Sequence, residues 1–190
     1  MNLYLCGMIG TGKSSIGRAL SKRLGWPFFD VDRWMEREAG KKSIRDIVAE
    51  EGWVSYRERE YKICRRLAKR KRSVVALAGG TVRYAWNMDV LRGTGVFILL
   101  KANLTVMVNR AKGNDRPRVN AGTTLRKDLI LLWKKHGHLY HEAADLVYRT
   151  DRQKTVRREA GEILETLRER EMLPAGTFHR TPARRRAPSE

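Results

Sequence analysis

Residues 7–14 read Gly7-Met8-Ile9-Gly10-Thr11-Gly12-Lys13-Ser14, a run that fits the pattern G-x-x-x-x-G-K-[ST]. A short apolar run at residues 2–6 precedes it, and residues 14–24 follow with apolar side chains at helical spacing. Glycines allow such a loop to curl so that its backbone N–H groups face inward, and the following helix adds its positive N-terminal end. Residues 7–14 therefore predict a phosphate-binding loop between a buried strand and a helix.

The side chains at the end of this loop suit a nucleotide with bound Mg²⁺. Lys13 would place a positive charge on the β- and γ-phosphates, and Ser14 offers a hydroxyl ligand to the metal. A glycine turn with a chance lysine is the alternative, and the complete pattern in its strand-to-helix context argues against it. The predicted nucleotide-binding residues of this stretch are Gly10, Thr11, Gly12, Lys13, Ser14 and Ser15.

The chain carries a strongly positive charge. Its 190 residues include 40 Lys and Arg against 21 Asp and Glu, which gives a formal net charge of +19. Such a balance favours nucleotides, phosphorylated metabolites or nucleic acid as partners, although solubility or an arginine-rich proteome explains it equally well. The basic clusters at residues 65–72 and 184–186 contain no interleaved aromatic residues, which weakens the hypothesis of a single-stranded nucleic-acid surface.

Apolar runs and cysteines narrow the class of protein further. No apolar run approaches the roughly 18 to 20 residues of a membrane-spanning helix, and the apolar residues 1–8 lack the features of a signal peptide. We therefore expect a cytoplasmic protein, or the mature part of an organellar one. Cys6 and Cys64 are far apart in the sequence and indicate neither a metal site nor a disulfide framework.

The order of apolar and helical segments predicts a parallel α/β protein. The length suits one domain, which we place at residues 1–171. We expect a three-layer α/β/α fold with a central five-stranded parallel sheet, whose strands lie at residues 2–6, 28–30, 73–78, 95–100 and 146–148. Helices are expected at residues 14–24, 33–39, 44–50, 55–71, 104–111, 125–146 and 156–170, with one more ending near residue 91.

Glycines and polar segments punctuate this pattern. Gly25 and Gly52 are expected to end helices, and Gly137 is expected to interrupt the helix at residues 125–146. The polar segment at residues 112–123 predicts a mobile loop. Residues 172–190 are rich in Pro, Gly, Thr and Arg, and predict a disordered basic tail.

Two carboxylates follow the second predicted strand, in the run Asp30-Val31-Asp32. At a spacing of two on an extended segment, both side chains point to the same side. One carboxylate would then hold Mg²⁺ or its water, while the other aligns a substrate hydroxyl or accepts its proton. The alternative is an acidic turn in which Asp32 caps the next helix, and the nearby phosphate loop favours the functional interpretation.

Beyond these residues, four stretches resemble the shikimate kinase family, a P-loop group related to the nucleoside monophosphate kinases. They are Ala49-Glu50-Glu51-Gly52 with Tyr56-Arg57-Glu58-Arg59-Glu60, Ala78-Gly79-Gly80-Thr81-Val82, Asp115-Arg116-Pro117, and Leu139-Tyr140-His141-Glu142-Ala143-Ala144-Asp145. The set is far more specific than any single member, and the resemblance covers about residues 2–167. It implies a P-loop kinase fold with a helical substrate-binding segment at about residues 31–62 and a lid at residues 112–123.

The resemblance implies a phosphoryl-transfer site that uses ATP and Mg²⁺. Lys13, Asp32 and Arg116 would be catalytic residues. Asp32 would bind the accepting hydroxyl, and Arg116 would reach over on the lid to stabilise the transferring phosphoryl group. Ser14 and Asp30 would hold the metal.

The resemblance also implies binding roles. Arg57 would pair with a substrate carboxylate, Gly79 and Gly80 would present backbone to the substrate, and Arg110 would lie against adenine. Taken without the resemblance, Arg57 and Glu60 read as a surface pair at i, i+3 on a helix, and Gly79-Gly80 reads as an ordinary turn.

Two residues depart from the family pattern. Ala78 stands where the family has a glycine, and His136 stands where it usually has an arginine that helps to hold the shikimate carboxylate. Histidine is shorter, offers no planar fork and is mostly neutral at pH 7. We expect His136 to bind substrate in its place, and the nearby basic residues that offer a substitute are Lys134, Lys135 and Arg126.

Three hypotheses about function follow. The first is ATP-dependent conversion of shikimate to shikimate 3-phosphate, in aromatic amino acid biosynthesis, by a monomer. The second is a kinase of the same fold that acts on another polyol, a sugar acid or a nucleoside, which His136 and Ala78 favour. The third is a kinase-like nucleic-acid or partner-binding protein, which the net charge of +19 favours and the complete phosphoryl-transfer set opposes.

Overall fold

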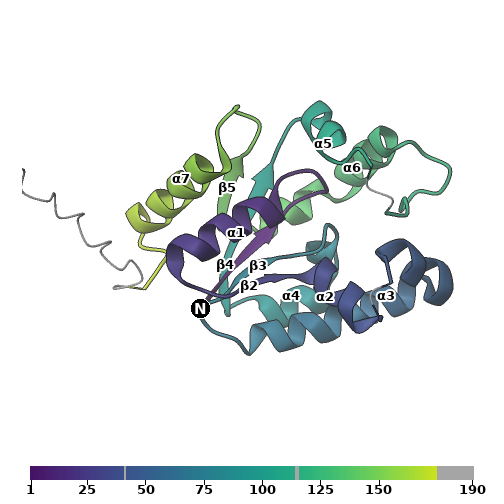
Figure 1. Cartoon of the computed structure of the whole chain (residues 1–190), viewed down its shortest axis with the longest axis horizontal. Helices are drawn as coiled ribbons and strands as arrows, with labels where there is room; N and C mark the ends of the chain where they lie inside the picture. The colour runs from purple at the N-terminus through teal and green to yellow at the C-terminus, as the bar shows by residue number, and fades with distance from the viewer. Residues whose placement is uncertain (41, 114–115, 175–190) are drawn as a thin grey trace, which may run out of the picture.

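The computed structural model describes residues 1–40, 42–113 and 116–174 and contains one sheet of five parallel strands (Figure 1). The strand order is β2-β3-β1-β4-β5, and each neighbouring pair is parallel. The strands are β1 (Asn2–Cys6), β2 (Phe28–Asp30), β3 (Val74–Ala76), β4 (Gly95–Lys101) and β5 (Leu146–Arg149). The predicted parallel α/β architecture is confirmed.

Helices cover both faces of this sheet and complete the three layers (Figure 1). In the described part of the chain they are α1 (Lys13–Leu24), α2 (Val31–Glu38), α3 (Ile44–Ala68), α4 (Ala85–Leu91), α5 (Leu104–Arg110), α6 (Leu125–Ala143) and α7 (Val156–Glu169), with a short 3-10 turn at Thr81–Arg83. The alternation of side chains along β1 separates two apolar clusters. Leu3 and Leu5 pack with residues of α1 and α7, whereas Tyr4 and Cys6 pack with residues of α3, α4 and α6.

Two glycines in the helices behave differently from each other. Gly52 has φ 77° and ψ 171° and breaks the path of α3, as its predicted role as a helix end requires. Gly137 was expected to interrupt α6, and that expectation is wrong, because α6 is continuous from Leu125 to Ala143. Gly137 is buried, and a Cβ atom there would come within 3.1 Å of the Trp133 ring. Close packing against this ring explains a glycine inside a helix, where it costs about 1 kcal/mol relative to alanine.

The end of the described chain packs onto the domain. Met172 and Leu173 lie against the apolar cluster under α7, so the first residues of the expected tail belong to the packed structure. The remainder of that tail, residues 175–190, lies outside the described residues. In the described part of the chain, no helix is both long and apolar enough to cross a membrane.

Candidate active site

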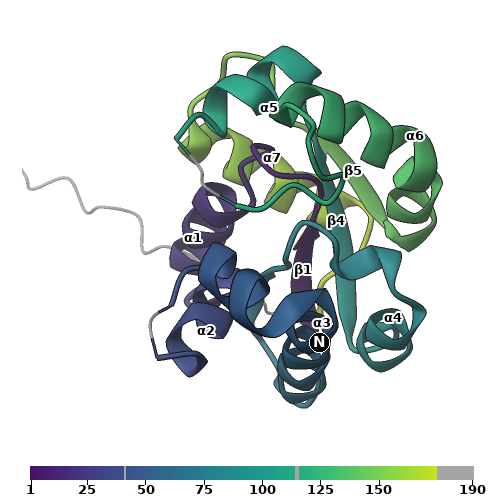
Figure 2. The ribbon, with the colours of Figure 1, turned by 90° about the vertical axis from the view of Figure 1, so that its right-hand side faces the viewer.

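The phosphate loop and two other loops meet at the carboxyl ends of neighbouring parallel strands, which is where open α/β sheets bind their ligands. The loop of residues 7–14 follows β1, Asp30 ends β2, and Gly79 and Gly80 follow β3. Figure 2 shows the segment that links α5 to α6 running between α6 and the α2–α3 side of the molecule, across this edge of the sheet.

The phosphate loop has the curled backbone that its glycines predict. Gly10 and Gly12 have φ values of 80° and 92°, which L side chains rarely adopt, and a Cβ atom at Gly10 would meet the Met107 carbonyl oxygen at 2.3 Å. The Lys13 ammonium group donates hydrogen bonds to the Gly7 oxygen at 2.9 Å and to the Met8 oxygen at 3.0 Å. These bonds hold the charge of Lys13 over the loop.

The surroundings of Lys13 weaken its hold on its proton. Removal of water lowers the pKa of Lys13 from an ordinary 10.5 to about 8, with Asp32 opposing this change and Arg116 adding to it. The ammonium therefore remains mostly protonated at neutral pH, and an anion bound beside it would favour its charged form.

Ser14 and Asp30 form the predicted metal pair. The Ser14 hydroxyl donates a hydrogen bond of 2.5 Å to an Asp30 carboxylate oxygen. Hydroxyl and carboxylate oxygens are ligands that Mg²⁺ accepts, and Mg²⁺ usually keeps several waters and takes few protein ligands beside substrate phosphates. Within the described ranges there is no group of three or more His, Cys, Asp and Glu residues that could hold a metal without such additional ligands. The residues present therefore fit a Mg²⁺ that arrives with a nucleotide.

Asp30 and Asp32 are not on one extended segment, so the geometric basis of that expectation is wrong. Helix α2 begins at Val31, and the Asp30 side chain caps it by accepting a hydrogen bond from the Arg33 backbone. Asp32 is not the cap but lies in the first helical turn. Because the Asp30 carboxylate accepts a hydrogen bond from a backbone N–H group that would otherwise be unpaired, the helix can begin directly after the strand.

Asp32 links the site to the lid. Asp32 is 7% exposed, its carboxylate forms an ion pair of 2.5 Å with the Arg116 guanidinium, and the Tyr56 hydroxyl donates to it at 3.4 Å. The structure thus brings together the three residues predicted to be catalytic, since Asp32 and Arg116 also contribute to the electrostatic environment of Lys13.

Arg57 is buried, which excludes the surface-pair interpretation. Its guanidinium pairs with Glu60 at 2.8 Å, and Glu60 is fully buried and accepts a further hydrogen bond from the Thr81 hydroxyl at 2.7 Å. The Arg57 guanidinium also lies over three aromatic rings, with 4.6 Å to the nearest ring centroid. These rings belong to Trp53, Tyr56 and Tyr84. Glu60 therefore holds Arg57 in one position, as a site for an anionic group requires.

The loop after β3 has a support of its own. The Tyr140 hydroxyl donates a 2.5 Å hydrogen bond to the Gly79 carbonyl oxygen, which ties the loop to α6. Gly79 and Gly80 line the same cavity as Arg57 and Arg116, so their backbone faces the predicted substrate position. Ala78 does not line this cavity. Its methyl group is buried in the core cluster beneath the loop, so it does not crowd the cavity.

Arg110 lines a second cavity, together with the phosphate loop, Asp30 and Asp32. Its guanidinium donates to the Thr150 hydroxyl and carbonyl oxygens at 3.0 and 2.7 Å, and that hydroxyl in turn donates to the Thr11 carbonyl oxygen. The structure therefore places Arg110 beside the phosphate loop, where a nucleotide base or ribose would extend from the phosphates.

A model of the shikimate kinase family matches residues 9–168. This chain belongs to the shikimate kinase family. It is 37% identical over 173 residues to the shikimate kinase of Symbiobacterium thermophilum, with 90% of this chain and 98% of that relative covered. It is 38% identical over 143 residues to the shikimate kinase of Microcystis aeruginosa, with 75% and 74% covered.

Solved structures agree with this assignment. The fold matches a shikimate kinase from Acinetobacter baumannii in complex with shikimate, with a TM-score of 0.84, 31% identity, and 90% of this chain and 95% of that chain covered. A deoxyadenosine kinase from M. mycoides, at 18% identity and a TM-score of 0.56, shares the fold alone. The shikimate kinase family consists of ATP-dependent kinases, so this chain is an ATP-dependent kinase.

The residues that depart from the shikimate kinase pattern can now be placed. His136 is half-buried and is not among the described residues that line the cavity beside Arg57. Burial lowers the pKa of His136 below its ordinary value, and the charge of Arg83 lowers it further, so the imidazole is neutral at pH 7. The three proposed substitutes, Lys134, Lys135 and Arg126, are exposed and do not line this cavity either.

Sequence reasoning missed Asp128, which anchors the lid of this shikimate kinase family member. Asp128 lies in the first turn of α6, is 4% exposed, and accepts hydrogen bonds from the backbone of Val119 at 3.4 Å and of Asn120 at 2.9 Å. The Asn120 side chain donates to the same carboxylate at 2.7 Å. Asp128 was not recognised because its partners lie eight and nine residues away on an irregular segment, for which a sequence pattern gives no signal.

We expect Asp128→Ala to lower kcat/KM by about tenfold or more, because each hydrogen bond to a charged group contributes about 1.5–3 kcal/mol. The lid would open more often, and Arg116 would spend less time at Asp32. Steady-state kinetics would measure the loss, and trypsin cleavage after Arg118 should become faster. The control is Asp89→Ala, which removes an exposed carboxylate on α4. Unchanged kinetics and cleavage in Asp128→Ala would contradict the anchoring role.

Proposed function

We propose that this kinase transfers the γ-phosphoryl group of ATP to shikimate and forms shikimate 3-phosphate. The observation that carries the proposal is the single cavity that joins Arg57, Gly79, Gly80 and Arg116, beside the ion pair of Arg116 with Asp32. A buried arginine suits a carboxylate, and a carboxylate beside the phosphate loop suits a hydroxyl. The family match and the relative in complex with shikimate support the same acceptor.

The mechanism uses groups that already face one another. The acceptor hydroxyl oxygen attacks the γ-phosphorus of ATP, the bond from that phosphorus to the β–γ bridging oxygen breaks, and ADP leaves. Asp32 accepts the hydroxyl proton. Lys13 contacts the phosphates, and Arg116 exchanges its pairing with Asp32 for the transferring group, where charge develops. Lid residues held by Asp128 exclude water and so suppress hydrolysis of ATP.

Several finer statements belong to the same proposal. Ser14 and Asp30 would hold Mg²⁺, which neutralises phosphate charge when it is bound. Gly10, Thr11, Gly12, Ser15 and Arg110 would bind the nucleotide, as their position in or beside the phosphate loop supports. We further propose a cytoplasmic monomer that acts in aromatic amino acid biosynthesis, which rests on the family membership and on the sequence.

A coupled assay of ADP release with MgATP tests the function. Shikimate should support turnover, and NMR of the product should place the phosphate on the 3-hydroxyl. Quinate, gluconate and a panel of nucleosides are the comparison acceptors. Binding of ATP without turnover of shikimate, or faster turnover of another acceptor, would overturn the proposal and favour a different substrate of the same fold.

The affinity of the free enzyme for ATP should fall as pH rises from about 7 to 9, because Lys13, with a pKa of about 8, loses its charge in this range. Calorimetric titration of ATP at several pH values measures the effect. Stability is not its cause: Lys13 in the unfolded chain keeps its proton up to an ordinary pKa of 10.5, so this group makes the fold more stable as pH rises above 8. The profile of Lys13→Ala should lack the step, and an identical profile would contradict the assignment.

A further inference from the structure

The substrate cavity contains more positive charge than the known roles use. Arg57, Arg83 and Arg116 all line it, together with Arg118 from the lid. Arg116 pairs with Asp32, and Arg57 pairs with Glu60. Arg118 donates to the Arg116 carbonyl oxygen at 3.2 Å. Arg83 differs from Arg57 and Arg116, and resembles Arg118, in having no ion pair among the described residues.

Arg83 has no acidic partner among the described residues. Its Nε atom is buried and makes no hydrogen bond, although the side chain as a whole is only half-buried. A buried N–H group of a charged side chain without a partner costs free energy, and an anion in the cavity would supply that partner. Among the described residues that line the cavity, Asp128 is the one with a carboxylate, and it already accepts three hydrogen bonds from the lid.

Arg83 lies close to Gly80 and to the Tyr84 ring. It ends the turn Thr81–Arg83 that follows Gly80, and a Cβ atom on Gly80 would come within 2.4 Å of an Arg83 terminal nitrogen. Its guanidinium lies 5.9 Å from the centroid of the Tyr84 ring, and the Arg57 guanidinium lies 4.6 Å from the same centroid. The two arginines therefore share one aromatic platform beside one cavity. Arg57 also has a buried Nε atom without a hydrogen bond.

The presence of His136 in place of the family arginine suggests a role for Arg57 and Arg83 together. His136 is neutral at pH 7 and lies outside the cavity lining, so it does not contribute the second charge that the family arginine gives. The charge of Arg83 contributes to lowering the pKa of His136, after burial, so the two side chains interact electrostatically. Two guanidinium groups, one compensated by Glu60 and one uncompensated, match a single carboxylate better than one group does.

We propose that Arg83 is a substrate-binding residue that contacts the carboxylate of the acceptor together with Arg57, in place of the family arginine that His136 has replaced. This inference rests on the proposed function and names the specificity determinant of the same site. It explains how a chain that lacks the usual arginine keeps two positive charges for binding a carboxylate. The second guanidinium comes from the turn after β3 and not from α6.

Kinetics of Arg83→Gln test the proposal. KM for shikimate should rise about 10- to 100-fold, as the loss of one charged hydrogen-bond contact predicts, while KM for ATP stays within about twofold. Arg83→Lys keeps the positive charge but lacks the planar fork of the guanidinium. Its KM for shikimate should lie between those of the unmodified enzyme and Arg83→Gln. His136→Ala is the comparison variant on α6, and it should leave KM for shikimate nearly unchanged because His136 does not line the cavity. An unchanged KM in Arg83→Gln, or a larger rise in His136→Ala, overturns the proposal.

A neutral acceptor separates contact from loop distortion. The analogue in which a hydroxymethyl group replaces the carboxylate should be a poor substrate of the unmodified enzyme, and Arg83→Gln should not make it worse. If Arg83 only supported Gly80, the substitution would weaken both acceptors equally. In Arg83→Gln/His136→Arg, the arginine on α6 should restore much of the shikimate affinity. Failure of the unmodified enzyme to turn over shikimate overturns the proposed function itself, whereas turnover with an unaffected Arg83 variant overturns this inference alone.

Discussion

Lys13→Ala is expected to lower kcat at least about a hundredfold, because in the proposed mechanism Lys13 places a point charge on the phosphates. Its ammonium lies in the curl of the loop, bonded to the Gly7 and Met8 carbonyl oxygens, and it has Asp32 and Arg116 as charged neighbours. A methyl group in its place leaves the loop backbone and the helix end to bind phosphate, so ATP should still bind, with lower affinity.

Coupled kinetics and calorimetric ATP titration would measure both effects of Lys13→Ala. The matched control is Lys22→Ala, which removes a lysine from the exposed surface of the same helix, α1. Thermal unfolding should show that the Lys13 variant is folded. Turnover close to that of the unmodified enzyme would sink the assignment of residues 7–14 as the working phosphate loop.

Arg116→Ala is expected to lower kcat by at least about a hundredfold, with a smaller change in the affinity for ATP. Arg116 forms a 2.5 Å ion pair with Asp32, so this lid residue reaches the acidic side chain that we propose aligns the acceptor. Without this guanidinium, charge on the transferring phosphoryl group loses a partner that is delivered only when the lid is closed.

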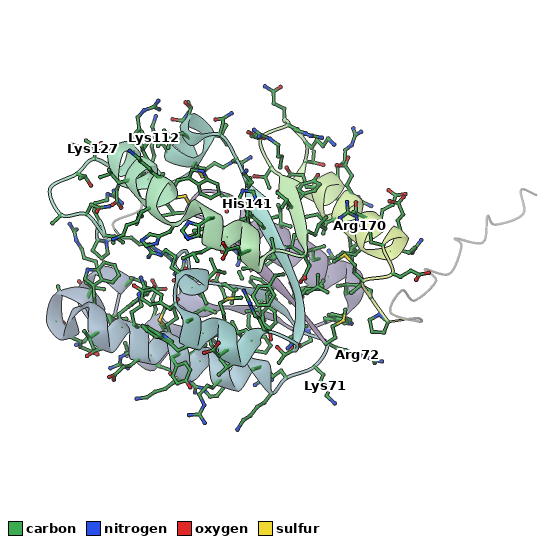
Figure 3. The ribbon with its side chains drawn as sticks, turned by 180° about the vertical axis from the view of Figure 1, so that it is seen from behind. Lys71, Arg72, Lys112, Lys127, His141 and Arg170 are labelled. Atoms are coloured by element: carbon green, nitrogen blue, oxygen red, sulfur yellow. The ribbon has the colours of Figure 1, made fainter. Side chains whose placement is uncertain are left out.

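Single-turnover measurements would show whether the loss of kcat in Arg116→Ala lies in the phosphoryl-transfer step or in product release. Lys127→Ala is the matched control, since Lys127 lies at the exposed start of α6, near the lid but away from the cavity (Figure 3). A loss confined to KM, with kcat preserved in Arg116→Ala, would show that Arg116 holds the ground state and not the transition state.

Local pattern was enough to predict much of this molecule. The strand at residues 2–6, the phosphate loop and the helix that Gly25 ends are consecutive in the sequence, and the structure has them at nearly the predicted bounds. Each depends on features within a few residues, such as glycine at positive φ or a short continuous apolar run. The break at Gly52 was predictable for the same reason.

Predictions failed where packing or a specific side-chain contact, and not the residue pattern, decides the structure or the role of a residue. Gly137 does not break α6, since packing on the buried face outweighs its low helix propensity. Asp30 caps α2 and so places Asp32 on a helix, which an alternating pattern did not reveal. His136, which was expected to bind substrate, is not among the described residues that line the cavity, whereas Arg83 lines it although its position in the sequence gave no signal.

The sequence by itself determined the parallel α/β class, the phosphate-binding loop and the family, because each is carried by short runs of residues whose chemistry is local. Only the tertiary structure decided which charges meet. Arg57 is held by Glu60, Arg116 reaches Asp32, Asp128 fixes the lid, and Arg83 remains without an acidic partner among the described residues. Electrostatic pairing depends on distances of a few ångströms between side chains that are far apart in the sequence, so it is set only when the sheet and its loops are assembled.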